Sequence, residues 1–108
     1  MDKALLCGPL LLALAGCSPA REEVEKQFET FVNGANQCTA ASECAVVTPG
    51  CPLGCFVAVR ADRQAAVEAK ARDLIAQYER AGARCEYECV TVGPLTCTDG
   101  RCGFGPVP

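Results

Sequence analysis

The sequence predicts a small α+β fold, rich in disulfides, with two helices and a short antiparallel sheet that ends in a C-terminal hairpin. Three observations predict it. Eight of the ten cysteines lie between residues 38 and 102, two stretches repeat apolar residues at helical spacing, and short β-branched runs alternate with turns that contain Gly or Pro. The 108 residues suffice for one small domain. Beyond residue 16, Leu, Ile, Val and Phe make up roughly a fifth of the chain, so we expect covalent cross-links to support a marginal core.

Residues 1–16 have the pattern of a signal peptide. A short polar start precedes an apolar run of about ten residues, whereas a helix that spans a bilayer needs ~20. The run ends in Leu14-Ala15-Gly16-Cys17. This stretch resembles the lipobox of bacterial lipoproteins, in which one aliphatic and two small residues precede the modified cysteine. The resemblance implies that a peptidase cuts before Cys17 and that the acylated Cys17 holds the protein to membrane lipid.

The same resemblance implies a place in the bacterial cell envelope. Ser18 follows the modified cysteine, where an aspartate would favour retention at the inner membrane in enteric bacteria, so we expect the outer membrane. The chain then divides into a signal peptide (1–16), a lipidated N-terminus with an amphipathic helix (17–37) and a disulfide-stapled α+β domain (38–108).

The first helix is predicted over residues 20–35. Ser18-Pro19 offers an N-cap and a proline at the first helical position, and Asn33-Gly34 weakens the end. The apolar residues that recur at helical spacing are Val24, Phe28, Phe31, Val32 and Ala35. The helix starts beside the acylated cysteine. Its apolar face therefore has two possible uses, packing on the domain core, which we favour, or lying on the membrane.

Short strands and a second helix follow. Residues 45–48 and 56–59 read as strands, separated by the loop 48–55 with two prolines and two glycines. A long helix is predicted over residues 62–81, which Gly82 ends. Its expected buried stripe consists of Val67, Ala71, Leu74, Ile75 and Tyr78.

The eight remaining cysteines predict four disulfides, because their number is even and the signal peptide implies an oxidising compartment. They are Cys38, Cys44, Cys51, Cys55, Cys85, Cys89, Cys97 and Cys102. Eight cysteines allow 105 pairings, so the connectivity stays open. The alternative is a cysteine metal-binding domain, because Cys51/Cys55 and Cys85/Cys89 each enclose three residues, as some zinc knuckles do. We favour disulfides and expect neither a metal nor a cofactor.

The C-terminal part is predicted to contain a strand and a hairpin. Over residues 85–92 the cysteines alternate with Glu86 and Glu88, which predicts a half-buried strand with its carboxylates in solvent. Asp99-Gly100 is a favoured type I′ turn. It places Cys97 and Cys102 opposite each other, where they can bond directly or project inward to bond other elements.

The composition argues against some classes of function but does not identify one. A net charge of −3 and the lack of a basic patch argue against nucleic acid as a partner. The chain has no histidine, and we expect it not to be an enzyme. We expect a membrane-anchored envelope lipoprotein that acts as a non-catalytic binding or structural module, with an envelope or extracellular protein as a possible partner. An alternative is a small protease inhibitor that presents the loop Pro49–Gly54, with Leu53 as its anchor.

Overall fold

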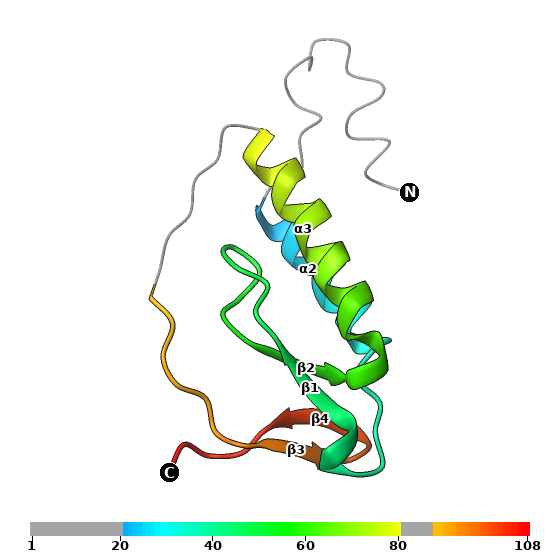
Figure 1. The fold of residues 1–108 in the computed structure, drawn as a ribbon. Helices are drawn as coiled ribbons and strands as arrows, with labels where there is room; N and C mark the ends of the chain where they lie inside the picture. Colours follow the sequence, from blue (N-terminus) through cyan, green and yellow to red (C-terminus); the bar gives the residue numbers. More distant parts are fainter. Residues whose placement is uncertain (1–20, 81–87) are drawn as a thin grey trace.

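The computed structural model describes residues 21–80 and 88–108. Two antiparallel helices stand on one side of the fold, and two small sheets lie at their lower end (Figure 1). The predicted class, a small disulfide-rich α+β fold with a C-terminal hairpin, is confirmed. Among the described residues, no helix is both long enough and apolar enough to cross a membrane.

Both predicted helices are present. Helix α2 spans Arg21–Asn33, and α3 spans Gln64–Arg80 after a single 3-10 turn at Ala61–Arg63. The apolar face of α2 is buried through Val24 and Phe28. The buried residues of α3 are Val67, Ala71, Leu74 and Tyr78, and Ile75 is half-buried at the edge of the stripe. The 3.6-residue period therefore identified the inward faces of both helices correctly.

The strands form two separate antiparallel pairs. Strand β1 (Cys44–Val47) pairs with β2 (Val57–Arg60), and β3 (Leu95–Thr98) pairs with β4 (Arg101–Phe104). In the first pair Cys44 lies opposite Arg60. Strands of four residues cannot build a core alone, and each pair depends on what it packs against.

The buried apolar residues form two adjoining clusters. The larger one joins the two helices to the β1–β2 pair and contains Val24, Phe28, Ala35, Val47, Val59, Val67, Ala71, Leu74 and Tyr78. The smaller one lies between the two strand pairs and is built mainly from cysteine, with Cys38, Cys44, Ala58 and Cys102. Disulfides thus take the place of large apolar side chains in the second cluster.

The strand predicted over residues 85–92 is wrong where the structure describes it. Residues 88–92 form no strand, and Val90 is 77% exposed. Cys89 is exposed too, although the alternation placed it on an inward face. The reason is that this segment meets no sheet edge along which its backbone could pair, so alternation of side chains alone cannot make a strand. Residues 85–87, including Cys85 and Glu86, lie outside the described residues.

Candidate functional site

Two disulfides fasten the C-terminal hairpin to the rest of the domain. Cys38, which follows α2, bonds Cys97 on β3, and Cys44 at the start of β1 bonds Cys102 on β4. We call these four residues the sulfur cluster. The sulfur atoms of Cys38, Cys44 and Cys102 all lie within 4.8 Å of one another. Three of the four residues are buried, with 7–8% of their surface exposed.

The turn of the hairpin determines the positions of Cys97 and Cys102. Asp99 and Gly100 adopt positive φ angles of 54° and 76°, as a type I′ turn requires. Cys97 and Cys102 are directly opposite in the ladder, as predicted. Of the two possibilities left open by the sequence, the structure shows the second, because each of the two bonds a cysteine on another element.

Hydrogen bonds hold the same hairpin to the segment after α2. The Cys38 amide donates to the Gly100 carbonyl at 3.0 Å, and the Cys102 amide donates to the Asn36 carbonyl at 2.8 Å. The Arg101 guanidinium donates to the Asn36 side-chain oxygen at 3.0 Å. Asn36 is the one buried polar residue among the described residues, and this contact satisfies its side-chain oxygen. The hairpin is therefore attached by polar contacts as well as by disulfides.

A carboxylate orders the loop between Cys38 and Cys44. Glu43 accepts hydrogen bonds from the Thr39 amide at 2.8 Å and the Thr39 hydroxyl at 3.0 Å. The backbone bond from Thr39, followed by the one from its hydroxyl, lowers the pKa of Glu43 below its ordinary value of 4.5. The Thr39–Glu43 contacts therefore brace the short loop, which contains a 3-10 turn at Ala41–Glu43, between the two cysteines.

The other described disulfide joins Cys55 to Cys89, with 5.6 Å between the Cα atoms. Cys51 is also disulfide-bonded. The zinc-knuckle spacing noted in the sequence therefore does not make a thiolate site, because Cys55 and Cys89 bond each other. The fourth predicted bridge requires Cys85 and stays a prediction.

The loop Pro49–Gly54 is closed on itself. The Gly50 amide donates to the Gly54 carbonyl at 3.0 Å, and the Leu53 amide donates to the Gly50 carbonyl at 2.7 Å. Leu53 is half-buried and packs against the core cluster beside α2. Leu53, the anchor in the inhibitor hypothesis, therefore already makes packing contacts within this protein.

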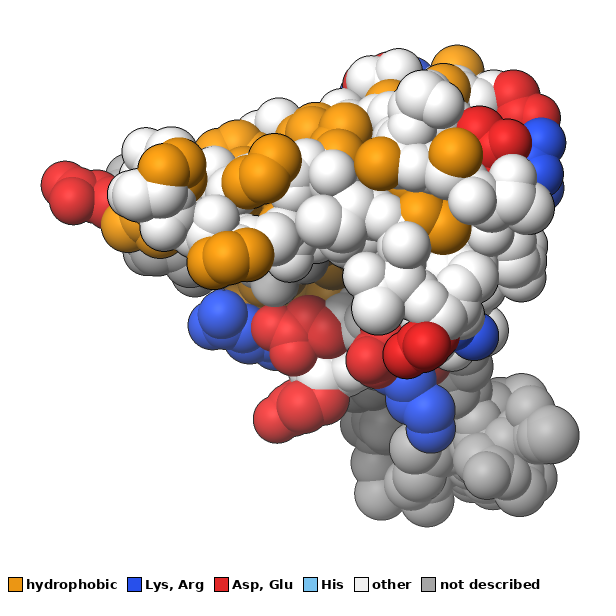
Figure 2. Space-filling model, turned by 90° about the horizontal axis from the view of Figure 1, so that it is seen from below, with side chains coloured by type: hydrophobic (Ala, Val, Ile, Leu, Met, Phe, Trp, Pro, Cys, Tyr) orange, Lys and Arg blue, Asp and Glu red, His pale blue; other side chains and the backbone are white. Residues whose placement is uncertain are grey.

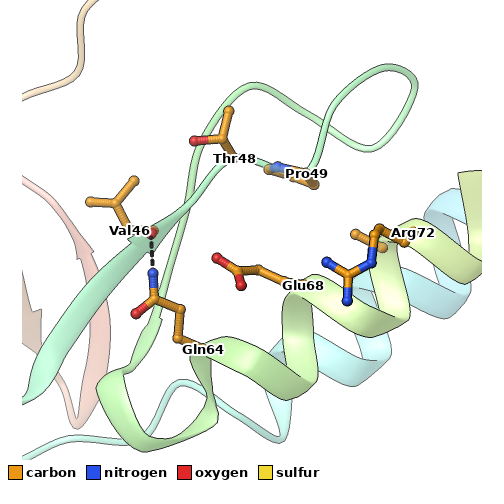
Figure 3. A pocket seen from close by; sticks show the side chains of 7 residues that line it. Val46, Thr48, Pro49, Gln64, Glu68 and Arg72 are labelled. Carbon is orange, nitrogen blue, oxygen red and sulfur yellow. Dashed lines mark hydrogen bonds between the residues drawn. The ribbon is translucent and has the colours of Figure 1, made fainter.

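A polar cleft of about 420 Å³ lies between α3 and the end of β1 (Figure 3). The Gln64 amide closes one side by donating to the Val46 carbonyl at 3.1 Å. The Glu68 carboxylate points from the helix toward Thr48, and Arg72 lies one turn further along (Figure 3). Sequence reasoning missed this group, although the spacing of 64, 68 and 72 by four residues puts these side chains on one helix face. The cleft offers a carboxylate, a guanidinium and a hydroxyl to a small polar ligand.

Apolar side chains are exposed at the hairpin end of the molecule. We call this the hairpin-end surface, and it comprises Pro94, Pro106, Val107 and Pro108. Val107 is 58% exposed. Val90, which is 77% exposed, lies apart from this surface, next to the Cys55–Cys89 disulfide. The Gly105 amide donates to the Pro94 carbonyl at 2.7 Å, so the two segments that carry this surface are joined. The view from below shows hydrophobic side chains spread over this side of the molecule, with charged ones toward its edges (Figure 2).

The remaining candidates fall outside a common site. Glu88 is exposed, in agreement with the solvent-facing role predicted for it. Its predicted neighbour Glu86 and Cys17, the predicted lipidation residue, lie outside the described residues. No protein-family model, curated protein or solved structure matches this chain.

Proposed function

We propose that this protein is a lipoprotein of the bacterial cell envelope, anchored through acylated Cys17 in the outer membrane, and that it acts as a non-catalytic binding module for another protein. The observation that carries the proposal is the motif Leu14-Ala15-Gly16-Cys17 at the end of an apolar run, which resembles a lipobox. Helix α2 begins at Arg21, and Val24 is already in the core with none of its surface exposed. The lipobox cysteine therefore lies a few residues from the folded domain, which the anchor would hold close to the membrane.

The apolar face of α2 is used inside the protein. Val24 and Phe28 are 0% and 3% exposed, and both belong to the core that α2 shares with α3. A face buried in this way cannot also lie among lipid headgroups. Of the two uses considered for this helix, core packing is the one that the contacts support, and the acyl chains would supply the membrane affinity. Each buried CH₂ contributes ~0.8 kcal/mol, so several long chains on one residue make release negligible.

The direction of α2 predicts how an anchored domain would be oriented relative to the membrane. The Arg63 and Lys70 side chains lie 5.9 and 5.8 Å from the ring centroid of Phe31, so the end of α2 meets the start of α3. The start of α2 thus lies at the end of the helix pair away from the hairpin (Figure 1). An anchor before Arg21 would turn the hairpin-end surface away from the membrane that holds it.

The proposed partner is a protein with an apolar contact surface, bound through the hairpin-end surface. Lipid is disfavoured as the occupant because the anchor would lie at the opposite end of the domain. The net charge of −3 disfavours nucleic acid. The protease-inhibitor hypothesis is weaker, because Leu53 would have to leave the core to enter a protease pocket.

Replacing Cys17 tests the anchor. Cys17→Ser removes the thiol that the acyl chain requires, so we expect the protein to lose its lipid mass and to leave the membrane fraction on a carbonate wash. Cys7→Ser is the matched control, because Cys7 lies within the segment that is cleaved off. This substitution should leave the lipid mass and the membrane retention of the protein unchanged. Membrane retention of the Cys17→Ser protein after the wash would refute lipid anchoring.

Single tryptophans test the orientation, because the natural chain has none. In the lipidated protein on vesicles with brominated acyl chains, Glu22→Trp beside the anchor should be quenched more than Val107→Trp on the hairpin-end surface. Equal quenching at both sites would show that the domain lies flat on the bilayer. It would remove the argument for a protein partner without affecting the anchor.

A further inference from the structure

We propose that the sulfur cluster is a masked metal site: when its two disulfides are reduced, Cys38, Cys44, Cys97 and Cys102 bind one zinc ion as a tetrahedral thiolate site. This inference is independent of the lipid anchor. It uses different cysteines from those that the spacing in the sequence suggested, because the fold brings together residues from both halves of the chain.

The positions of the sulfur atoms suit a metal ion. In a tetrahedral site with Zn–S bonds of ~2.3 Å, the sulfur atoms lie about 3.8 Å apart. The Cys38 sulfur lies within 4.8 Å of the sulfurs of Cys44 and Cys102, which are bonded to each other, and the fourth sulfur, from Cys97, is bonded to that of Cys38. The Cα atoms of the two bonded pairs are 6.1 and 5.8 Å apart. Rotation of the side chains can therefore supply the remaining adjustment without a new backbone arrangement.

The frame around the cluster has supports that reduction does not remove. The amides of Cys38 and Cys102 donate to the Gly100 and Asn36 carbonyls, and Arg101 bridges the same two segments through Asn36. The β3–β4 ladder keeps Cys97 opposite Cys102. The thiols are thus presented by positioned backbone on four segments, namely the segment after α2, β1, β3 and β4, which lowers the ordering cost of collecting four ligands.

The surroundings also suit a thiolate–zinc group. Ala58, Leu95 and Phe104 pack around the cluster and limit the access of water. Four thiolates on Zn²⁺ leave two excess negative charges. Arg101 precedes Cys102 and, among the described residues, bonds only neutral acceptors, so its charge is the one close to the cluster. The Arg60 guanidinium opposite Cys44 is instead ion-paired with Asp62 at 2.9 Å. Soft thiolate ligands favour zinc over hard cations such as Mg²⁺ or Ca²⁺.

With a dithiol as reductant, the electrons and protons of the conversion from two disulfides to a zinc site balance. Each disulfide takes two electrons and two protons from one dithiol, which is itself oxidised to a disulfide. Two dithiols thus convert the cluster to four thiols. Binding of one Zn²⁺ then forms four Zn–S bonds and releases four protons to solvent. In the reverse step two disulfides of the oxidised dithiol accept the four electrons, and four protons from solvent, as the two S–S bonds re-form and Zn²⁺ is released. The same residues therefore hold the hairpin by disulfides or through a metal ion.

Cobalt and alkylation test the site. The whole mature protein is reduced with a phosphine, freed of it and titrated with Co²⁺ under anaerobic conditions. We expect the intense visible absorption of tetrahedral thiolate cobalt to saturate at one equivalent from this cluster. With Zn²⁺ bound, alkylation followed by peptide mass mapping should leave Cys38, Cys44, Cys97 and Cys102 unlabelled, while Cys55 and Cys89 are labelled.

Matched double variants locate the ligands. Cys38→Ala with Cys97→Ala removes two ligands and should abolish the cobalt absorption, whereas Cys55→Ala with Cys89→Ala should retain it. Circular dichroism in zinc shows whether each reduced chain is folded. Refolding of the reduced natural chain by zinc would support the site. A reduced chain that neither binds cobalt nor gains structure with zinc would overturn the proposal. The proposal would also be overturned if the Cys55→Ala, Cys89→Ala variant lost the cobalt absorption while the Cys38→Ala, Cys97→Ala variant kept it.

Discussion

Leu74→Ala is expected to destabilise the domain by about 3–4 kcal/mol. Leu74 is 0% exposed and is the largest fully buried side chain among the described residues. Its substitution removes three carbon atoms, at ~0.8 kcal/mol each, or about 2.4 kcal/mol of transfer free energy. Each ~40 Å³ of cavity that fails to collapse adds about 1 kcal/mol. Because small domains have ~5–15 kcal/mol in total, this one substitution removes a large fraction of the stability.

Stability is measured by thermal and urea unfolding of the oxidised protein, and unfolding is monitored by circular dichroism. A loss of 1 kcal/mol lowers the Tm of a domain of this size by ~4–8 °C, so we expect a fall of roughly 15–25 °C with an unchanged urea m-value. Glu79→Ala is the matched control on the same helix, since Glu79 is exposed and should change stability by less than ~0.5 kcal/mol. Ile75→Ala should fall between the two, because Ile75 is half-buried. Equal losses for Leu74→Ala and Glu79→Ala would refute the assignment of the buried face.

We expect three further outcomes, two at the hairpin and one in the loop between Cys38 and Cys44. Asn36→Ala removes the acceptor of Arg101 and should cost about 1–2 kcal/mol in urea unfolding, and an unchanged midpoint would show that the contact contributes nothing. Gly100→Ala should cost about 1–2 kcal/mol, because Gly100 has a φ of 76° and no atom within 4 Å of the added methyl group, so backbone strain is the only penalty. The lowered pKa of Glu43 means that its contribution is complete above the ordinary value of 4.5 and is lost as the pH falls through the lowered pKa. Glu43→Gln should remove this part of the pH dependence of Tm, and an NMR titration that finds the Glu43 pKa at or above 4.5 would contradict the Thr39 contact.

Local chemistry determined most of the secondary structure. Repeated apolar residues identified the helix that contains Val67 and Leu74, because the period of a helix is a property of neighbouring residues. Asp99-Gly100 identified the hairpin for the same reason, since positive φ angles are a preference of the residue itself. The pattern failed at residues 88–92, where the alternation around Cys89 looked like a strand. A strand needs a partner edge, and the distant chain did not supply one.

Only the tertiary structure decided which cysteines meet. Cys38 and Cys97 are 59 residues apart, and Cys44 and Cys102 are 58 apart. Close spacing along the chain drew attention to Cys51 and Cys55 instead, yet the sulfur cluster is assembled by the packing of the hairpin against the segment after α2. The proposed lipobox Leu14-Ala15-Gly16-Cys17 lies at the other extreme, because a peptidase would recognise such a motif as a short linear sequence. The local periods of this sequence therefore predicted its helices and its hairpin. The disulfide pairing, the polar cleft and the cluster of four sulfurs depend on contacts between distant segments, which the sequence does not encode at any fixed spacing.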